Sequence, residues 1–283
     1  MRTLLEKTKS RLEEAGLDNP YNLAQDLVCA VFKVEPVDIL TRNYMPDRAK
    51  EALLFEYTEL VASGKPLQYV LKTAHFLDIE LYVDQRVLIP RPETEGLADI
   101  ARQFIDLRKK RGQGDGSAVT TVLDLCTGSG CIGLYLSKHG GNVTMTDISA
   151  DALEVAKWNA SALGQEVEIK CGDLFEALEQ GDGSGVQFDI ITANPPYIPT
   201  SVIPSLDINV RAWEPVEALD GGEHGWELPD RIVKEYDKFL KPGGLFLMEI
   251  GDDQGSHYKT LCPNGRIIQD MEGHDRILAI RKI

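Results

Sequence analysis

The sequence predicts an α/β protein with a parallel, doubly wound sheet, and three observations support this fold class. From about Val119 onward, short apolar runs typical of buried strands alternate with helical patterns. A glycine-rich turn follows the first of these runs. Polar residues come directly after the second, third and fourth runs. Because ligands of open α/β sheets bind at the carboxyl ends of the strands, we expect the functional site there.

Length and charge narrow the possible functions. A chain of 283 residues with 43% hydrophobic residues has room for about two domains with proper cores. The formal net charge is 30 − 45 = −15, which disfavours binding to a phosphate backbone. A small-molecule substrate or a basic protein partner fits this charge better. Net charge is an average over the chain, so a local basic groove remains an alternative.

The cysteines and the apolar runs predict a reduced cytoplasmic protein. The odd number of cysteines argues against a full disulfide framework, and their spacing fits no zinc site, so we expect no metal. The N-terminus carries charges throughout, and we expect neither a signal peptide nor a membrane span. The five cysteines are Cys29, Cys126, Cys131, Cys171 and Cys262.

The first 72 residues predict a small bundle of helices. Asn19 and Pro20 mark the start of one helix, and residues 47–62 carry apolar side chains at helical spacing. We expect residues 1–72 to form a helical domain that docks the substrate protein.

Residues 73–90 change to the alternating period of a β-hairpin, which we expect to link two domains. A domain of residues 91–283 follows. Pro92 suits the first position of a helix, with Glu93 and Glu95 in the first turn. That helix is predicted to end in a flexible loop at residues 112–117. The alternating apolar residues of the hairpin are Phe76, Ile79, Leu81 and Val83.

The rest of this domain alternates between strands and helices. The predicted strands are Thr121–Leu125, Asn142–Thr146, Val167–Cys171, Phe188–Ala193, Leu245–Ile250, Arg266–Asp270 and Arg276–Arg281. The predicted helices between them are Ile132–Lys138, Ala150–Leu163 and Leu228–Leu240.

The loop after the first strand has the pattern of a nucleotide-binding turn. Gly128, Gly130 and Gly133 match the dinucleotide fingerprint, in which glycines allow a tight turn and a close approach to the ligand. Asp147 ends the second strand and can accept hydrogen bonds from both hydroxyls of a ribose. These residues fit NAD, and they fit S-adenosylmethionine equally well.

The sequence Asn194-Pro195-Pro196-Tyr197 points to the chemistry. The two prolines stop the fourth strand, so Asn194 stands at its carboxyl end on a stiff turn. The side-chain oxygen of Asn194 and the carbonyl oxygen of Pro195 are two fixed acceptors for the protons of a planar –NH2 group. Hydride transfer needs no such clamp. With Gly172–Phe175 after the third strand, the turn therefore favours S-adenosylmethionine and an amide or amino nucleophile.

In these motifs the chain resembles the HemK/PrmC-type protein-(glutamine-N5) methyltransferases. The resemblance implies a helical N-terminal domain, a β-hairpin linker and a class I, Rossmann-like methyltransferase domain with a seven-stranded sheet. The matching segments are Gly64–Val70, Val87–Glu95, Leu123–Ile132, Asp147–Ser149, Gly172–Phe175, Asn194–Ile198, Glu214–Pro215 with Ala218–Leu219, and Leu240–Gly244.

The resemblance also implies an activity. S-adenosylmethionine would be the donor and S-adenosylhomocysteine the product. The acceptor would be the glutamine of the Gly-Gly-Gln loop of class 1 peptide chain release factors, which act in translation termination. A cytoplasmic monomer that pairs with its substrate protein is expected.

The expected roles follow from the motifs and the resemblance together. Catalysis is assigned to Asn194, Pro195 and Tyr197, with Tyr197 packed against the substrate amide. No side chain is assigned as an essential base, because the methylated nitrogen can lose its proton after transfer. Cofactor binding is assigned to Cys126, Thr127, Gly128, Ser129, Gly130, Asp147, Asp173, Leu174 and Asn194. Substrate binding is assigned to Asn194, Pro195, Pro196, Tyr197, Arg91 and Glu93, although Arg91 and Glu93 equally fit a structural role at the helix start.

The chain departs from the family pattern at two places. Cys126 stands where glycine is usual, which is tolerated if this residue keeps a negative φ. Residues 223–226 replace a more usual Asp-Gly-Leu pattern.

Other functions share the same turn. A sister family methylates a glutamine of a ribosomal protein, but residues 89–95 look more like the release-factor branch. Methylation of an amino group on a nucleic-acid base is a second alternative. A non-catalytic binding module is a third, which the intact turn and glycine loop disfavour.

Overall fold

The computed structural model describes residues 1–41, 45, 47–111, 119–178 and 186–283, and the chain divides into two compact units. One unit comprises Met1–Thr73 with Asp207–Trp213, and the other comprises Ala74–Leu206 with Glu214–Ile283. The flexible loop expected at residues 112–117 lies outside the described residues. No described helix is long and apolar enough to cross a membrane.

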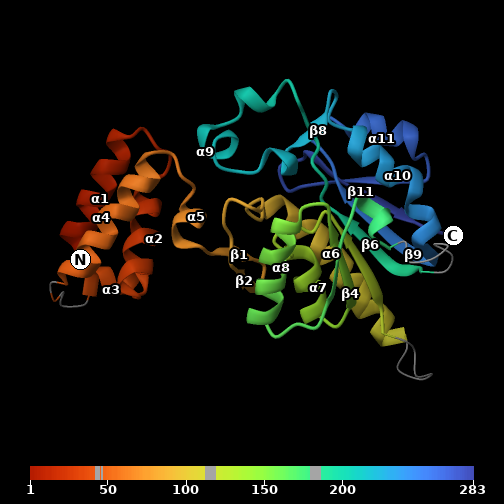
Figure 1. Ribbon diagram of the computed structural model, residues 1–283, viewed down its shortest axis with the longest axis horizontal. Helices are drawn as coiled ribbons and strands as arrows, with labels where there is room; N and C mark the ends of the chain where they lie inside the picture. Colours follow the sequence, from red (N-terminus) through yellow and green to blue (C-terminus); the bar gives the residue numbers. More distant parts are fainter. Residues whose placement is uncertain (42–44, 46, 112–118, 179–185) are drawn as a thin grey trace. The chain divides into compact units, whose positions relative to one another are not determined.

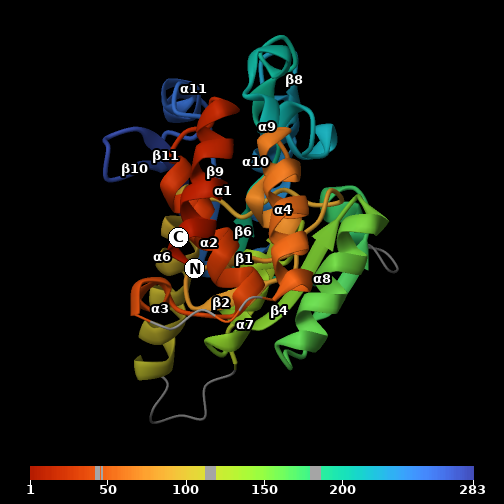
Figure 2. The ribbon, with the colours of Figure 1, turned by 90° about the vertical axis from the view of Figure 1, so that its left-hand side faces the viewer.

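The first unit is a helical bundle, in which α1, α2 and α4 lie side by side (Figure 2). Asn19 precedes α2 in the left-handed conformation, and the Asp47 carboxylate caps α4 by accepting from the backbone N–H groups of Ala49 and Lys50. The helices are α1 (Arg2–Glu14), α2 (Pro20–Phe32), α3 (Pro36–Thr41), α4 (Arg48–Ala62), α5 (Leu67–Leu71) and the short α9 (Ile208–Arg211).

The second unit is built on a seven-stranded sheet with the order β10-β11-β9-β6-β3-β4-β5. The pairs β5–β4, β4–β3, β3–β6 and β6–β9 are parallel. These strands are β3 (Thr121–Leu125), β4 (Asn142–Asp147), β5 (Glu168–Cys171), β6 (Phe188–Ala193), β9 (Leu240–Glu249), β10 (Arg266–Gln269) and β11 (Asp275–Arg281).

The prediction of a parallel, doubly wound sheet is confirmed, and one edge of the sheet is antiparallel. β11 is antiparallel to both β9 and β10. Only a tight turn at residues 270–274 joins β10 to β11, and so short a connection reverses the chain. β11 thereby inserts between β9 and β10.

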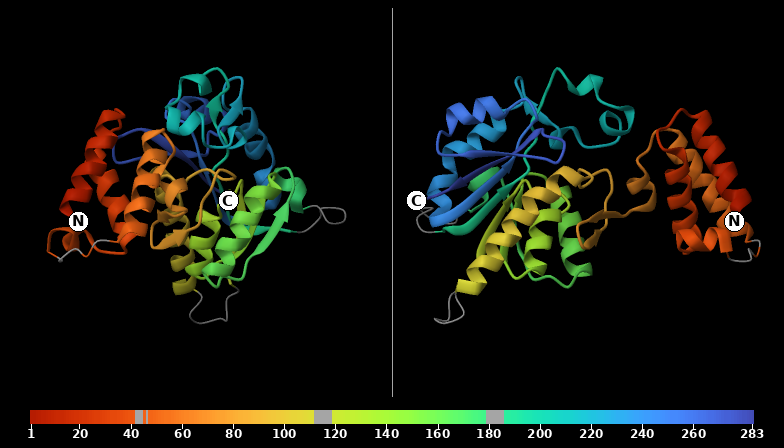
Figure 3. Two further views of the ribbon diagram at one scale, coloured as in Figure 1. Left: turned by 60° about the vertical axis from the view of Figure 1, so that its left-hand side comes forward. Right: turned by 180° about the vertical axis from the view of Figure 1, so that it is seen from behind.

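Helices cover both faces of this sheet (Figure 1, Figure 3). One apolar core lies under α6 (Pro92–Arg111), α7 (Cys131–Lys138) and α8 (Ala150–Ala162). The other lies under α10 (Glu227–Phe239), α11 (Gly255–Leu261) and the 3₁₀ turn Leu174–Leu178. All six residues of β6 are buried, as expected for a central strand covered on both faces.

Smaller elements complete this unit. The hairpin of β1 (Ala74–Phe76) and β2 (Ile79–Leu81) packs into the first of these cores, where Phe76 contacts Tyr135 edge to face. A two-stranded parallel sheet joins β7 (Ile198–Pro199) to β8 (Asp220–Gly222). Two short 3₁₀ turns, Ile203–Ser205 and Val216–Ala218, lie between these strands in sequence.

Candidate active site

A cavity of about 440 Å³ opens at the carboxyl ends of β3, β4 and β6, which is where the sequence places the site. The predicted site residues that line it are Arg91, Cys126, Thr127, Gly128, Ser129, Asp147, Asp173, Leu174, Asn194 and Pro196. Four further predicted residues, Glu93, Gly130, Pro195 and Tyr197, are not part of its lining. Lining residues to which the sequence analysis assigned no role in the site include Arg86, Leu88, Thr94, Ile148, Ser149 and Pro215.

The loop after β3 winds through several left-handed residues. Cys126 has φ +55°, so the condition of a negative φ at this position is not met. The side chain is accommodated in a conformation that glycine adopts without strain and that costs other residues about 1–2 kcal/mol. Gly128 (φ +54°) and Gly130 (φ +85°) share this conformation. Gly133 is required for a different reason, since an added Cβ would lie 2.5 Å from the Met145 sulfur on β4.

Asp124 anchors this loop from inside the sheet, a role that the sequence analysis missed. Its fully buried carboxylate accepts hydrogen bonds from the Thr127 hydroxyl at 2.5 Å and the Gly133 backbone N–H at 3.1 Å. The Thr192 hydroxyl on β6 donates to its other oxygen at 2.7 Å. Burial raises the pKa of Asp124 to about 6. A carboxylate inside an otherwise apolar strand was the available signal, because buried charges are seldom unpaired.

Asp147 ends β4 and faces the same loop. One carboxylate oxygen accepts from the Gly128 backbone N–H and the other from the Ser149 N–H, both at 2.9 Å. Burial raises the pKa of Asp147, while these backbone hydrogen bonds lower it. Each oxygen has two lone pairs, so the carboxylate can still accept from a ligand in the cavity.

The turn after β5 supplies an apolar wall. Leu174 is 7% exposed and adopts φ +49° at the edge of the cavity. Asp173 also lines the cavity, but one of its oxygens accepts from Arg231 at 2.8 Å. The predicted contact between Asp173 and an adenine amino group would therefore use the other oxygen or the backbone.

The turn after β6 is held by two buried residues. Asn194 Nδ2 donates to Thr94 Oγ1 at 3.1 Å, and the Tyr197 hydroxyl donates to Glu249 Oε1 at 3.0 Å. Thr94 and Glu249 are each 1% exposed. Burial raises the pKa of Glu249, and the hydrogen bond from the Tyr197 hydroxyl lowers it. The Glu249 carboxylate thus holds the last residue of the turn.

Arg91 contributes a cation to the wall of the cavity. Its Nη2 donates to both oxygens of the buried Glu214 at 2.8 and 2.7 Å. Burial raises the pKa of Glu214, whereas the charge of Arg91 lowers it. The pair fastens the start of α6 to the segment that carries Pro215, another wall residue.

Comparison with known proteins decides the family. The PrmC N-terminal domain model matches residues 3–71, and the methyltransferase small domain model matches residues 113–204. The release factor glutamine methyltransferase of Clostridium acetobutylicum is 34% identical over 287 residues, covering 97% of this chain and 96% of that protein. The one from Caulobacter vibrioides is 34% identical over 279 residues, covering 95% and 92% respectively.

This chain belongs to the release factor glutamine methyltransferase family. The second unit also has the fold of a solved class I methyltransferase. The Thermus thermophilus 16S rRNA N2 G1207 methyltransferase, in complex with AdoMet and guanosine, matches with a TM-score of 0.53 at 17% identity. That match covers 75% of this chain and 50% of the other, and a likeness at such low identity concerns the fold alone.

Proposed function

We propose that this protein transfers a methyl group from S-adenosylmethionine to the side-chain amide nitrogen (N5) of the glutamine in the Gly-Gly-Gln motif of class 1 peptide chain release factors. Membership of the family supports this substrate. The observation that supports this reaction is the orientation of the Asn194 side-chain amide at the cavity wall. Its amide nitrogen is committed to Thr94, which leaves the amide oxygen for a substrate donor.

The cavity suits S-adenosylmethionine in size and in chemistry. Its volume of about 440 Å³ lies within the range of small-molecule sites. Asp147 offers acceptors for the ribose hydroxyls, Leu174 offers an apolar surface for the adenine, and residues 126–130 offer backbone groups for the methionine end. When bound, this cofactor supplies an electrophilic methyl group on a sulfonium.

The protein's own part in the reaction is to position the nucleophile. An amide nitrogen is a weak nucleophile because its lone pair is delocalised into the carbonyl group. Hydrogen bonds from its two protons to Asn194 Oδ1 and the Pro195 carbonyl would fix the nitrogen and stabilise positive charge as it develops there. Tyr197 closes this end of the turn and helps to exclude water. The nitrogen loses a proton after transfer, so no general base is assigned.

Further parts of the proposal concern the partner. Residues 1–72 dock the release factor, the enzyme is a monomer, and it does not bind nucleic acid. The net charge of −15 favours a protein partner over a nucleic acid. A cytoplasmic location follows from a substrate that acts in translation.

The experiment is to incubate the purified enzyme with S-adenosylmethionine and unmodified release factor, then map methylation by mass spectrometry. We expect one added methyl on the Gly-Gly-Gln glutamine, and none on a release factor in which that glutamine is glutamate. A methyl group on another residue would refute the claim that the Gly-Gly-Gln glutamine is the acceptor. If the enzyme methylates a ribosomal protein or RNA but not the release factor, the claim that the release factor is the substrate is refuted.

A further inference from the structure

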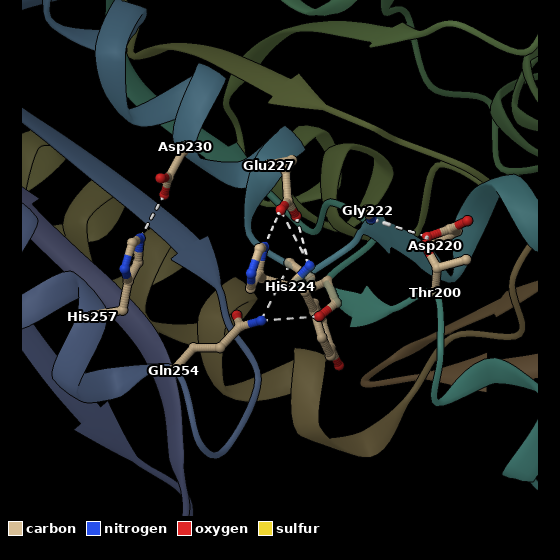
Figure 4. A network of polar contacts seen from close by, with 10 residues as sticks. Thr200, Asp220, Gly222, His224, Glu227, Asp230, Gln254 and His257 are labelled. Atoms are coloured by element: carbon tan, nitrogen blue, oxygen red, sulfur yellow. Dashed lines mark hydrogen bonds and ion pairs between the residues drawn. The ribbon is translucent and has the colours of Figure 1, made fainter.

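Gln254 is a buried amide in which every polar atom has a partner. It is 2% exposed and lies just after β9, at the residue before α11. Its side-chain oxygen accepts from the Gly251 backbone N–H at 2.9 Å. Its side-chain nitrogen donates to the carbonyl oxygens of Tyr197 at 2.9 Å and Gly225 at 3.2 Å. Figure 4 labels Gln254 within this network of polar contacts. One side chain thus ties together three segments that are distant in sequence.

The loop that contains Gly225 packs against the turn backbone to backbone. An added Cβ at Gly221 would lie 2.7 Å from the Tyr197 Cα, and one at Gly225 would lie 2.4 Å from the Tyr197 carbonyl oxygen. Such distances leave no space for side chains. Two backbone hydrogen bonds, Thr200 N–H to Gly222 O at 2.8 Å and Ile198 N–H to Leu219 O at 3.0 Å, complete the contact.

The outer side of the same loop is anchored by stacked rings. Trp226 stacks against His257 with ring centroids 4.4 Å apart and against His224 at 5.4 Å. Each histidine also contacts a carboxylate of α10: His224 lies 2.7 Å from Glu227, and His257 lies 2.9 Å from Asp230 (Figure 4). Residues 224–226 therefore form a support that is bonded to α10, and Gln254 joins this support to the turn.

A hydrogen bond that fixes the Tyr197 carbonyl also restrains the Pro195 carbonyl oxygen, which is one of the two acceptors of the turn. The ring of Pro196 locks its φ angle, so only ψ of Pro196 and the two backbone torsions of Tyr197 are free between the Tyr197 carbonyl and the Pro195 carbonyl. The hydrogen bond to the Tyr197 carbonyl therefore restrains the position of the Pro195 oxygen. Misplacement of a positioning group by about 1 Å can cost about a hundredfold in rate.

We propose that Gln254 is a positioning residue for methyl transfer, which holds the Asn194–Tyr197 turn in register with the loop of residues 219–227. The inference rests on the proposed function, because it assumes that this turn binds the substrate amide. Gln254 acts through the Tyr197 carbonyl and does not line the cavity. Its removal is therefore expected to slow transfer and leave cofactor binding intact.

The test compares Gln254→Met with the wild-type enzyme and with Ile277→Val. Methionine keeps the length and bulk of glutamine and cannot hydrogen-bond to either carbonyl. Ile277 is a core residue of β11 opposite Glu249, and its truncation lowers stability while removing no hydrogen-bonding group from the turn. We expect Gln254→Met to lower kcat at least tenfold, with the Kd for S-adenosylmethionine within twofold of wild type. Ile277→Val should leave kcat and the Kd for S-adenosylmethionine unchanged.

Equal kcat in Gln254→Met and Ile277→Val would overturn the proposal, as would a loss confined to cofactor affinity. If the methionine variant does not fold, Gln254→Asn tests the same point, since its shorter amide cannot reach both carbonyls. A wild-type enzyme that transfers no methyl to the release factor refutes the proposed function and this inference with it. A wild-type enzyme that does so, beside fully active Gln254 variants, refutes this inference alone.

Discussion

The Asn194 side-chain amide donates to Thr94 Oγ1 over 3.1 Å and so joins the turn after β6 to the first turn of α6. The two residues are 100 positions apart in the chain, and Thr94 is 1% exposed. One N–H of the amide points at Thr94, which turns the amide oxygen away from Thr94 and leaves it able to accept from a ligand.

Thr94→Val removes the hydroxyl and keeps the shape of the side chain. Asn194 would lose the acceptor that fixes its orientation, and such a hydrogen bond contributes about 0.5–1.5 kcal/mol. We expect kcat for glutamine methylation to fall about tenfold, since about 1.4 kcal/mol corresponds to a factor of ten. Steady-state kinetics measure this, and Thr94→Ser should restore the rate. A valine variant with the wild-type rate would show that Thr94 does not orient Asn194.

Asp147→Asn should weaken the binding of S-adenosylmethionine. An amide nitrogen in place of one oxygen would face the backbone N–H of Gly128 or of Ser149, which now donate to the carboxylate. A hydrogen bond to a charged group contributes about 1.5–3 kcal/mol, so we expect a Kd about 10–100-fold higher by isothermal titration calorimetry. The control is Asp151→Asn, an exposed residue at the start of α8. Equal affinity in the two variants would contradict the assignment of Asp147.

Gly133→Ala should destabilise the fold because the new Cβ would lie 2.5 Å from the Met145 sulfur. Overpacking of this kind costs about 1–3 kcal/mol and should lower the midpoint of urea unfolding. Gly96→Ala is the matched control, since its Cβ on α6 would meet only Ile277 Cδ1 at 3.9 Å. Alanine favours the helix there, so stability should rise slightly. The prediction fails if the two alanines have the same effect.

Asp124 should make stability depend on pH in a defined direction. Its pKa in the folded protein is about 6, above the ordinary value of 3.8, so the folded state binds more protons than the unfolded state between these values. This residue's contribution to stability is therefore largest below about pH 4 and declines until about pH 6. Asn at this position can accept from Thr127 and Gly133 and donate to Thr192, and it does not titrate.

The measurement for Asp124 is urea unfolding of the wild type and of Asp124→Asn at several pH values. As the pH rises from about 4 to about 7, the free energy of unfolding of the variant should increase relative to that of wild type by on the order of 2–3 kcal/mol. The comparison cancels the titration of groups that do not interact with Asp124. A constant difference across this range would show that Asp124 ionises normally in the folded state.

Local patterns in the sequence predicted the elements around the site well. Alternation and apolar runs place β3 and β6, and the proline pair places Asn194 at the end of β6. The direction of β11 could not be predicted in this way, because strand pairing depends on contacts between distant segments. The left-handed conformation of Cys126 could not be predicted either, because contacts between its loop and distant segments determine it.

The residues that hold the site were harder to predict than the residues that line it. Asp124 and Glu249 each interrupt an apolar strand, and Thr94 and Gln254 lie in a helix and at a helix start. Such residues have no distinctive spacing. Their importance comes from hydrogen bonds to partners that only the folded chain brings near, as Asn194 and Tyr197 show.

The central claim is that Asn194 presents the substrate amide for methyl transfer. The most direct measurement compares wild-type enzyme with Asn194→Ala in single-turnover transfer to a release factor, with the affinity for S-adenosylmethionine measured on the same preparations. We expect the variant to bind the cofactor within a few-fold of wild type and to transfer no detectable methyl to the glutamine. Transfer by Asn194→Ala at the wild-type rate would contradict the account.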